Sequence, residues 1–179
     1  VARKQELPLH DPRFKQLCGM GYALSPTGAD HQNNLIDNFA TFPGSETCNR
    51  LEEFGLETPL PLWGISELKI RAYIVEVAFK TFLDSAVICH FYPYTFKHMV
   101  DALSAATGWQ VSIAEIHEIG DRIVNMARLF LIREGFTADD DTLSARAFYR
   151  LESGPIAGKA LTPEELKQAI QNYYTRMGW

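Results

Sequence analysis

The sequence has few cysteines, no long apolar segment and no cluster of basic residues. Its 3 cysteines are widely separated and form no Cys-x-x-Cys pair, which favours a reducing cytoplasm over a secreted scaffold held by disulfides. No run approaches the roughly 18 apolar residues of a membrane span, and residues 1–6 do not form a signal peptide. We therefore expect a cytoplasmic protein without a membrane partner.

The charge balance and the ends of the chain narrow the class of protein further. A net charge of -5, with no basic patch interleaved with aromatic residues, argues against a nucleic-acid partner. The 179 residues are enough to bury a core without disulfides. The chain lacks an initiator methionine and ends abruptly at Trp179, so we expect a piece of a longer protein.

Apolar residues recur at helical spacing along most of the chain, and strand-like patterns are limited to short ambiguous runs, so we expect an all-α fold. A long helix begins with Ser66 as its N-cap. One of its faces is apolar and is formed by Leu68, Ala72, Val75, Phe79, Phe82 and Leu83. Because Lys69, Arg71, Glu76 and Lys80 occupy much of the remaining surface, this helix is expected to pack on one side only.

The other helices have recognisable beginnings and ends. Ser112 and Glu115 have the spacing of a capping box, and Thr162 precedes a proline at the first helical position. The helix after Ser112 carries an apolar stripe, with Gly120 marking the close approach of another backbone. The stripe is Ile116, Ile119, Ile123, Met126, Ala127 and Phe130. Further short helices are predicted over 47–54, with Gly55 as a left-handed cap, and from 96 to Gly108.

The segments between these helices are predicted to be turns and loops. Residues 1–30 are rich in proline and glycine and show no sustained period. Residues 137–144 contain three adjacent aspartates and are expected to form a solvated turn, because the alternating ligands of a calcium loop are missing. Arg128, in the helix that precedes this loop, is expected to pair with Asp121 or Glu134.

A carboxylate, a thiol and an imidazole occur close together at the end of the long helix. Asp84, Cys89 and His90 lie within seven residues of one another, between two apolar helical segments. A thiolate is a ligand suited to iron–sulfur clusters, zinc or copper, and a carboxylate accepts hydrogen bonds from a donor-rich heterocycle. The alternative is a buried structural cysteine, which on spacing alone is the commoner case.

The residues 83–91, Leu-Asp-Ser-Ala-Val-Ile-Cys-His-Phe, resemble a pterin-binding and cluster-binding segment of the aldehyde ferredoxin oxidoreductase family, which reads Asp-x-x-Gly-Leu-Cys. Asp84 and Cys89 are in register with the family motif. Val87 stands where the motif has glycine, and Ile88 replaces leucine. Valine does not easily take the positive φ that glycine permits, so the backbone at this point is where the chain departs from the family.

The resemblance extends over nearly the whole chain. Residues 21–31, Gly-Tyr-Ala-Leu-Ser-Pro-Thr-Gly-Ala-Asp-His, are similar to the family's Gly-Tyr-Ala-x-Ser-Pro-x-Gly-Ala-Asp-His. Residues 103–109, 120–135 and 173–179 are similar to its later helical segments. This implies that residues 1–179 are the C-terminal helical part of a longer enzyme, as one unit or two interleaved subdomains, with the N-terminal cofactor domain outside the chain.

The resemblance also implies a reaction and its cofactors. Enzymes of this family carry a tungsten or molybdenum bis-pterin cofactor and a 4Fe-4S cluster, and they oxidise an aldehyde to the carboxylic acid with ferredoxin as electron acceptor. By resemblance, Cys89 is the fourth ligand of the cluster and Asp84 hydrogen-bonds the pterin. The other three cluster ligands lie upstream in the family, so this part alone is expected to be inactive. His31, in the turn motif, is the candidate for catalytic proton transfer.

The remaining candidates have mainly structural interpretations. Asp30 is expected either to orient His31 or to cap the segment that follows it. His90 either tunes the cluster from beside the ligand or is a partly buried spacer. Cys18 and Cys48 match no ligand position and are expected in the core.

Two other functions compete with the aldehyde oxidoreductase. The first is a stand-alone helical binding or scaffold module that kept the fold and lost the cofactor. The second is an aromatic thioester reductase of the same family. For the oxidoreductase, we expect an exposed apolar patch near Cys89, where the cofactor domain would pack, and a homo-oligomer as one outcome of that exposure.

Overall fold

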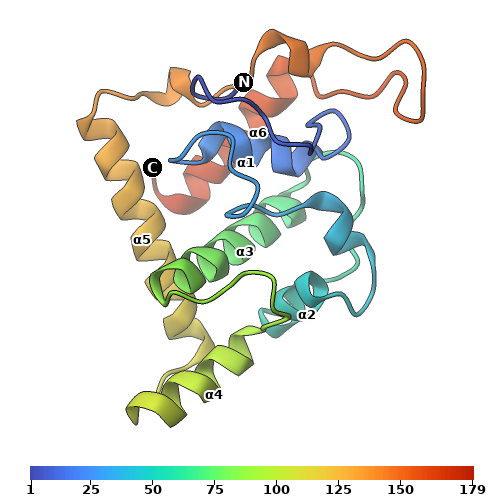
Figure 1. The fold of residues 1–179 in the computed structure, drawn as a ribbon. Helices are drawn as coiled ribbons and strands as arrows, with labels where there is room; N and C mark the ends of the chain where they lie inside the picture. The colour runs from blue at the N-terminus through green and yellow to red at the C-terminus, as the bar shows by residue number, and fades with distance from the viewer.

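The computed structural model describes residues 1–179, and its regular secondary structure is helical, apart from two isolated bridges between short loop segments (Figure 1). The all-α prediction is therefore confirmed. None of the helices is both long and apolar enough to span a bilayer. Three short 3-10 helices also occur, η1 (Asp37–Thr41), η2 (Ala138–Asp140) and η3 (Ala145–Phe148). The α-helices are α1 (Gln16–Leu24), α2 (Glu46–Glu53), α3 (Glu67–Ser85), α4 (Phe96–Thr107), α5 (Ile113–Arg133) and α6 (Pro163–Met177).

Helix α3 lies at the centre of the fold and contacts α1, α2, α5 and α6 (Figure 1). It is buried on most of its circumference, so the prediction that it packs on one side only is wrong. The charged side chains that suggested a solvated face are partly inside the protein, since Lys69 and Glu76 are each 1% exposed. Lys69 and Arg71 are the two basic residues nearest the N-terminus of α3, and of these only Arg71 is exposed to solvent.

Each buried charge on α3 has a partner from a segment that is distant in the sequence. The Lys69 ammonium donates to Oδ1 of Asp37 in η1 at 2.8 Å. The Arg50 guanidinium in α2 donates to both carboxylate oxygens of Glu76, at 2.6 and 2.8 Å. A buried carboxylate or ammonium is tolerated only with such a partner. The sequence pattern could not show these partners, which explains the error.

Helix α5 crosses α3 at Gly120, as the sequence predicted. A Cβ atom on Gly120 would lie 2.0 Å from the carbonyl oxygen of Ala78, so only glycine permits the two backbones to approach this closely. The predicted apolar stripe of α5 is correct only in part. Ile116 is fully buried, but Met126 and Phe130 are 65% and 60% exposed.

Helix α1 was not predicted, because proline and glycine surround it and its own N-terminus lacks a side-chain cap. The cap comes from elsewhere in the chain. The Asp37 carboxylate accepts hydrogen bonds from the backbone amides of Leu17 and Cys18, at 3.1 and 2.9 Å. A carboxylate at this position satisfies free amides and interacts favourably with the helix dipole. The same carboxylate also binds Lys69, so it joins α1, η1 and α3.

The helix boundaries that depend on local sequence are confirmed. The Ser66 side chain accepts a hydrogen bond from the amide of Lys69. Ser112 and Glu115 form the predicted capping box, and Thr162 caps α6. Gly55 and Gly108 have φ values of +67° and +75°, the left-handed conformation expected after a helix.

The acidic loop is only partly solvated. Asp139 and Asp140 are exposed, but Asp141 is 4% exposed, so the prediction of a solvated turn is wrong for this residue. Its carboxylate contacts the guanidinium groups of Arg3 and Arg128, the latter at 2.7 Å. Arg128 thus pairs with Asp141 and not with the neighbouring acids of its own helix. This ion cluster joins the N-terminal segment to α5.

Candidate functional site

The candidate site lies where α3 ends. Helix α3 closes with two backbone hydrogen bonds, from the Ile88 amide to the Leu83 carbonyl at 2.9 Å and from the Val87 amide to the Asp84 carbonyl at 3.1 Å. This pair of bonds defines a Schellman motif, in which the residue after the C-cap takes the left-handed conformation. Val87 occupies that position with φ of +57°. Val87 thus takes the left-handed conformation that glycine favours, and the departure of the backbone expected at this position is not found.

Replacing Val87 with glycine is expected to raise the free energy of unfolding by about 1 kcal/mol. The left-handed conformation costs an L-residue with a Cβ about 1–2 kcal/mol, and the added freedom of glycine in the unfolded chain offsets part of the gain. Val87 is 92% exposed, so little packing is lost. Urea unfolding followed by circular dichroism measures the change. As a control, Ala86 has an ordinary φ of -83°, so Ala86→Gly should be destabilising, and equal effects of the two changes would contradict the assignment of strain.

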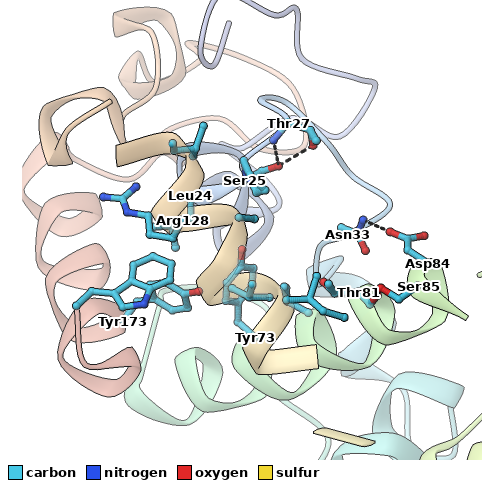
Figure 2. Close-up of a pocket in the computed structure, with 17 residues that line it drawn as sticks. Leu24, Ser25, Thr27, Asn33, Tyr73, Thr81, Asp84, Ser85, Arg128 and Tyr173 are labelled. Atoms are coloured by element: carbon cyan, nitrogen blue, oxygen red, sulfur yellow. Dashed lines mark hydrogen bonds between the residues drawn. The ribbon is translucent and has the colours of Figure 1, made fainter. Parts of the chain in front are cut away.

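Asp84 lies in the last turn of α3, and its side chain is 50% exposed. Its Oδ2 atom accepts a hydrogen bond from the side-chain amide of Asn33 (Figure 2). Nε2 of His90 lies 2.8 Å from Oδ1, but the ring N–H does not point at the oxygen. This second contact is therefore electrostatic and depends on the imidazole being protonated. Part of the carboxylate thus remains accessible to a ligand.

Asn33 is a site residue that the sequence did not reveal. A carboxylate only accepts hydrogen bonds, so the amide nitrogen of Asn33 must face Asp84 and the carbonyl oxygen must face away. That Oδ1 atom is shielded from solvent and has no partner. Asn33 and Asp84 together present unused acceptor capacity at one place. The only sequence signal was the position of Asn33 two residues after His31.

Asp84 and His90 line two different cavities. The narrower one, of about 210 Å³, is lined largely by apolar side chains of α3, α5 and α6, with Asp84 and Asn33 toward one end and Arg128 at the other (Figure 2). The wider one, of about 440 Å³, is lined by residues that include His10, His31 and His90. His90 is the link between the cavities, because it lines the wider one and contacts the carboxylate that lines the narrower one.

His31 lies in the wall of the wider cavity, in contact with other polar groups. Its ring packs against that of His10, with centroids 5.0 Å apart. The side-chain amide nitrogen of Gln32 lies 3.0 Å from Nε2 of His31 and can only donate, so Nε2 accepts and the ring is oriented by this bond. The Asp30 carboxylate forms no hydrogen bond with the His31 ring. Its carboxylate accepts from the Gln32 amide at 2.7 Å, so of the two expected roles it takes the capping role.

His10 is held as a neutral ring beside His31. Burial lowers the pKa of His10, and the positive charges of Lys15 and His31 lower it further. The Lys15 ammonium lies 2.5 Å from Nδ1 of His10 and has only protons to donate, so Nδ1 accepts and Nε2 carries the ring proton. No local sequence pattern had pointed to this role of His10.

The three cysteines have different environments. Cys18 and Cys48 are fully buried, as expected of core residues, and burial raises the pKa of the Cys18 thiol to about 12. Cys89 is an exposed free thiol. The interpretation of Cys89 as a buried structural cysteine is therefore wrong. Val87 and Phe91 beside it are 92% and 85% exposed, which is the apolar patch expected near Cys89.

The predicted site residues are brought to one region, though not into one cavity. His31 lines the wider cavity, Asp84 lines the narrower one, and Cys89 lies on the loop between α3 and α4 next to His90. No group of three or more His, Cys, Asp or Glu side chains in the chain could hold a metal ion. The residues fit one edge of a cofactor site, with an accessible thiol, an accessible carboxylate and the unpartnered oxygen of Asn33.

A family model and several curated relatives match the chain. The family model described as "Aldehyde ferredoxin oxidoreductase, domains 2 & 3" matches residues 1–179. The tungsten-containing aldehyde ferredoxin oxidoreductase of Pyrococcus furiosus is 32% identical over 100% of this chain and 28% of its own length. The corresponding protein of Thermococcus kodakarensis is 31% identical over 99% of the chain and 27% of its own length.

The chain is also similar to an oxidoreductase with a different described substrate. An aliphatic sulfonate oxidoreductase, WOR-like subunit, of Pyrococcus furiosus is 31% identical over 63% of this chain and 19% of its own length. The chain thus spans less than a third of each of these curated relatives.

Proposed function

Because the chain belongs to the aldehyde ferredoxin oxidoreductase family, we propose that it is the C-terminal helical part of a tungsten enzyme that oxidises an aldehyde to the carboxylic acid. The observation that carries this proposal is the end of α3. There, an accessible carboxylate and an exposed thiol flank a left-handed turn, next to a cavity lined by His31. An N-terminal cofactor domain outside this chain would complete the site.

The reaction determines which groups the chain must supply. Aldehyde and water yield carboxylic acid, two electrons and two protons. When bound, the tungsten-pterin group and a 4Fe-4S cluster supply the oxidation and the path of the electrons to ferredoxin, which we propose as the partner. The chain's own residues then have to bind the pterin, complete the cluster's ligands and accept protons.

Asp84 and Asn33 are proposed to bind the pterin. The heterocycle carries amine and ring N–H donors, which require acceptors that do not compete as donors. The Asp84 carboxylate is half exposed, and Oδ1 of Asn33 lacks a partner. Charge-assisted hydrogen bonds to the carboxylate would be the stronger of these contacts. Because Asn33 also donates to Asp84, it holds the carboxylate in a fixed orientation.

Cys89 is proposed to bind the 4Fe-4S cluster, and His31 is proposed to accept a proton. A 4Fe-4S cluster needs four thiolates, and Cys89 would be the one that this chain contributes. Because Cys89 is exposed, its sulfur is free to bind the iron of a cluster whose other ligands come from another domain. His31 lines the wider cavity, and its imidazole can accept a proton released by the reaction.

The cluster assignment is tested by replacing Cys89 with alanine in the complete enzyme. We expect the iron content per tungsten to fall and the oxidation of aldehyde with ferredoxin to be lost, because three thiolates do not hold the cluster stably. Iron and tungsten are measured by elemental analysis of the purified protein. Cys48→Ala is the matched control, since Cys48 is fully buried and bonded to the Ala40 carbonyl, and it should keep its iron. Unchanged iron in the Cys89 variant would remove the assignment.

A further inference from the structure

The wider cavity has an aromatic rim, formed by the side chains of Phe39, Phe42, Phe91 and Tyr92. These rings are 52%, 61%, 85% and 63% exposed, in the same order. Two come from η1 and the residue that follows it, and two from the loop after α3, so segments far apart in the sequence bring them together. Apolar surface is favourably removed from water, so four rings that line one cavity suit a ligand with apolar area.

The cations of this cavity are already paired. Arg50 donates to Glu76 at 2.6 Å and to the Tyr94 carbonyl at 3.0 Å. Lys80 donates to the Asn34 carbonyl at 2.6 Å and lies 3.4 Å from Oε1 of Glu76. The two cations share the Glu76 carboxylate, and Glu46 in the same wall supplies a second negative charge, so little net positive charge is left to bind an anionic ligand.

The other groups in the wall also disfavour an anion. Glu46 lines the cavity, and its carboxylate would repel a negatively charged ligand. Nδ1 of His10 accepts from the Lys15 ammonium, so His10 adds a neutral ring to the wall. The cavity therefore combines a polar floor with an aromatic rim, and its volume of about 440 Å³ falls in the range of roughly 300–1,000 Å³ typical of small-molecule sites.

We propose that this cavity is the substrate site and that it selects a neutral aromatic aldehyde, with the substrate ring on the aromatic rim and the carbonyl group toward His31. This inference rests on the proposed function, which makes an aldehyde the substrate. Aromatic rings in offset or edge-to-face contact attract each other beyond the effect of area alone. A saturated ring of similar size should therefore bind about twofold to tenfold more weakly.

Binding to the chain tests the cavity without any cofactor. Benzyl alcohol and cyclohexylmethanol serve as neutral probes, and their dissociation constants are measured by NMR titration. We expect benzyl alcohol to bind about twofold to tenfold more tightly, and Phe42→Leu to abolish this preference while keeping most of the apolar area. Phe130→Leu is the control, because Phe130 on α5 is 60% exposed, close to the 61% of Phe42, and does not line the cavity. Equal binding of the two alcohols, no binding of benzyl alcohol, or an unchanged preference in the Phe42 variant would overturn the inference.

Turnover by the tungsten-loaded enzyme separates this inference from the proposed function. Benzaldehyde should be oxidised with a higher kcat/KM than cyclohexanecarbaldehyde or 4-carboxybenzaldehyde, and Phe42→Leu should reduce the advantage over the saturated ring. Oxidation of the three aldehydes with equal kcat/KM would refute the aromatic selection and leave the proposed function in place. Oxidation of none of them, nor of acetaldehyde, would refute the proposed function itself.

Discussion

Replacing Lys69 with methionine is expected to lower the free energy of unfolding by about 3–5 kcal/mol. Lys69 is 1% exposed, and its ammonium donates to Asp37 at 2.8 Å and to the Leu62 carbonyl at 3.1 Å. Methionine fills a similar volume but leaves the Asp37 carboxylate buried without a cation. Removing one member of a buried pair costs more than the pair contributes, because the charge that remains cannot regain its hydration.

The effect should reach α1, because the same carboxylate accepts from the amides of Leu17 and Cys18. If Asp37 takes up a proton to avoid an isolated charge, its interaction with the N-terminus of α1 weakens. Hydrogen exchange of the amides in α1 should therefore become faster in the Lys69 variant. Urea unfolding followed by circular dichroism measures the global loss of stability.

Lys97→Met is the matched control. Lys97 lies 2.7 Å from Oδ1 of Asp101, nearly the distance found in the buried pair, but the two side chains are 64% and 60% exposed. Water and salt screen such a pair, so its loss should change the free energy of unfolding by less than about 0.5 kcal/mol. Equal losses in the two lysine variants would show that burial does not determine the effect, against this prediction.

Replacing Asp141 with asparagine is the second change with a large expected effect, a loss of about 3–5 kcal/mol. The Asp141 side chain is fully buried and is shared by Arg3, Arg128 and the Tyr174 hydroxyl. Asparagine keeps the shape of the side chain but removes the negative charge between two buried guanidinium groups. The charge of both arginines is then uncompensated, and the N-terminal segment should detach from α5.

Limited proteolysis and urea unfolding test this expectation together. Cleavage after Arg3 or Lys4 should become faster in the Asp141→Asn variant, because that segment is attached through the Arg3 contact. Asp139→Asn is the control, since Asp139 lies two residues earlier in the same loop and is exposed. It should leave both stability and cleavage close to those of the unchanged chain. A stable Asp141 variant with an unchanged cleavage rate would show that the ion cluster does not hold the N-terminal segment.

The same type of long-range contact builds the candidate site. Asn33 lies after α1 and donates to Asp84 at the end of α3, 51 residues later. Lys80 supports this arrangement by donating to the Asn34 carbonyl at 2.6 Å. These contacts bring the segment of His31 to the end of α3, so that the proposed proton acceptor, pterin ligand and cluster ligand lie in one region of the protein.

Some properties of the protein were determined by the sequence itself. Helix starts at Ser66, Ser112 and Thr162 follow from hydrogen bonds between residues three positions apart, which any chain with that local sequence can form. The close crossing at Gly120 follows from the absence of a side chain. The motif from Asp84 to Cys89 was also readable, because those residues are adjacent in the chain.

Other properties were decided only by the tertiary structure. Whether Lys69, Glu76 and Asp141 are solvated or buried depends on partners that lie 13 to 138 residues away, and no local pattern encodes such pairings. Helix α1 likewise depends on the carboxylate of Asp37, about 20 residues further on. Asn33, His10 and the aromatic rim are likewise placed at the site by contacts between segments that are distant in the sequence. Local hydrogen bonding acts along the chain, whereas desolvation of charges and enclosure of a cavity depend on which segments pack together.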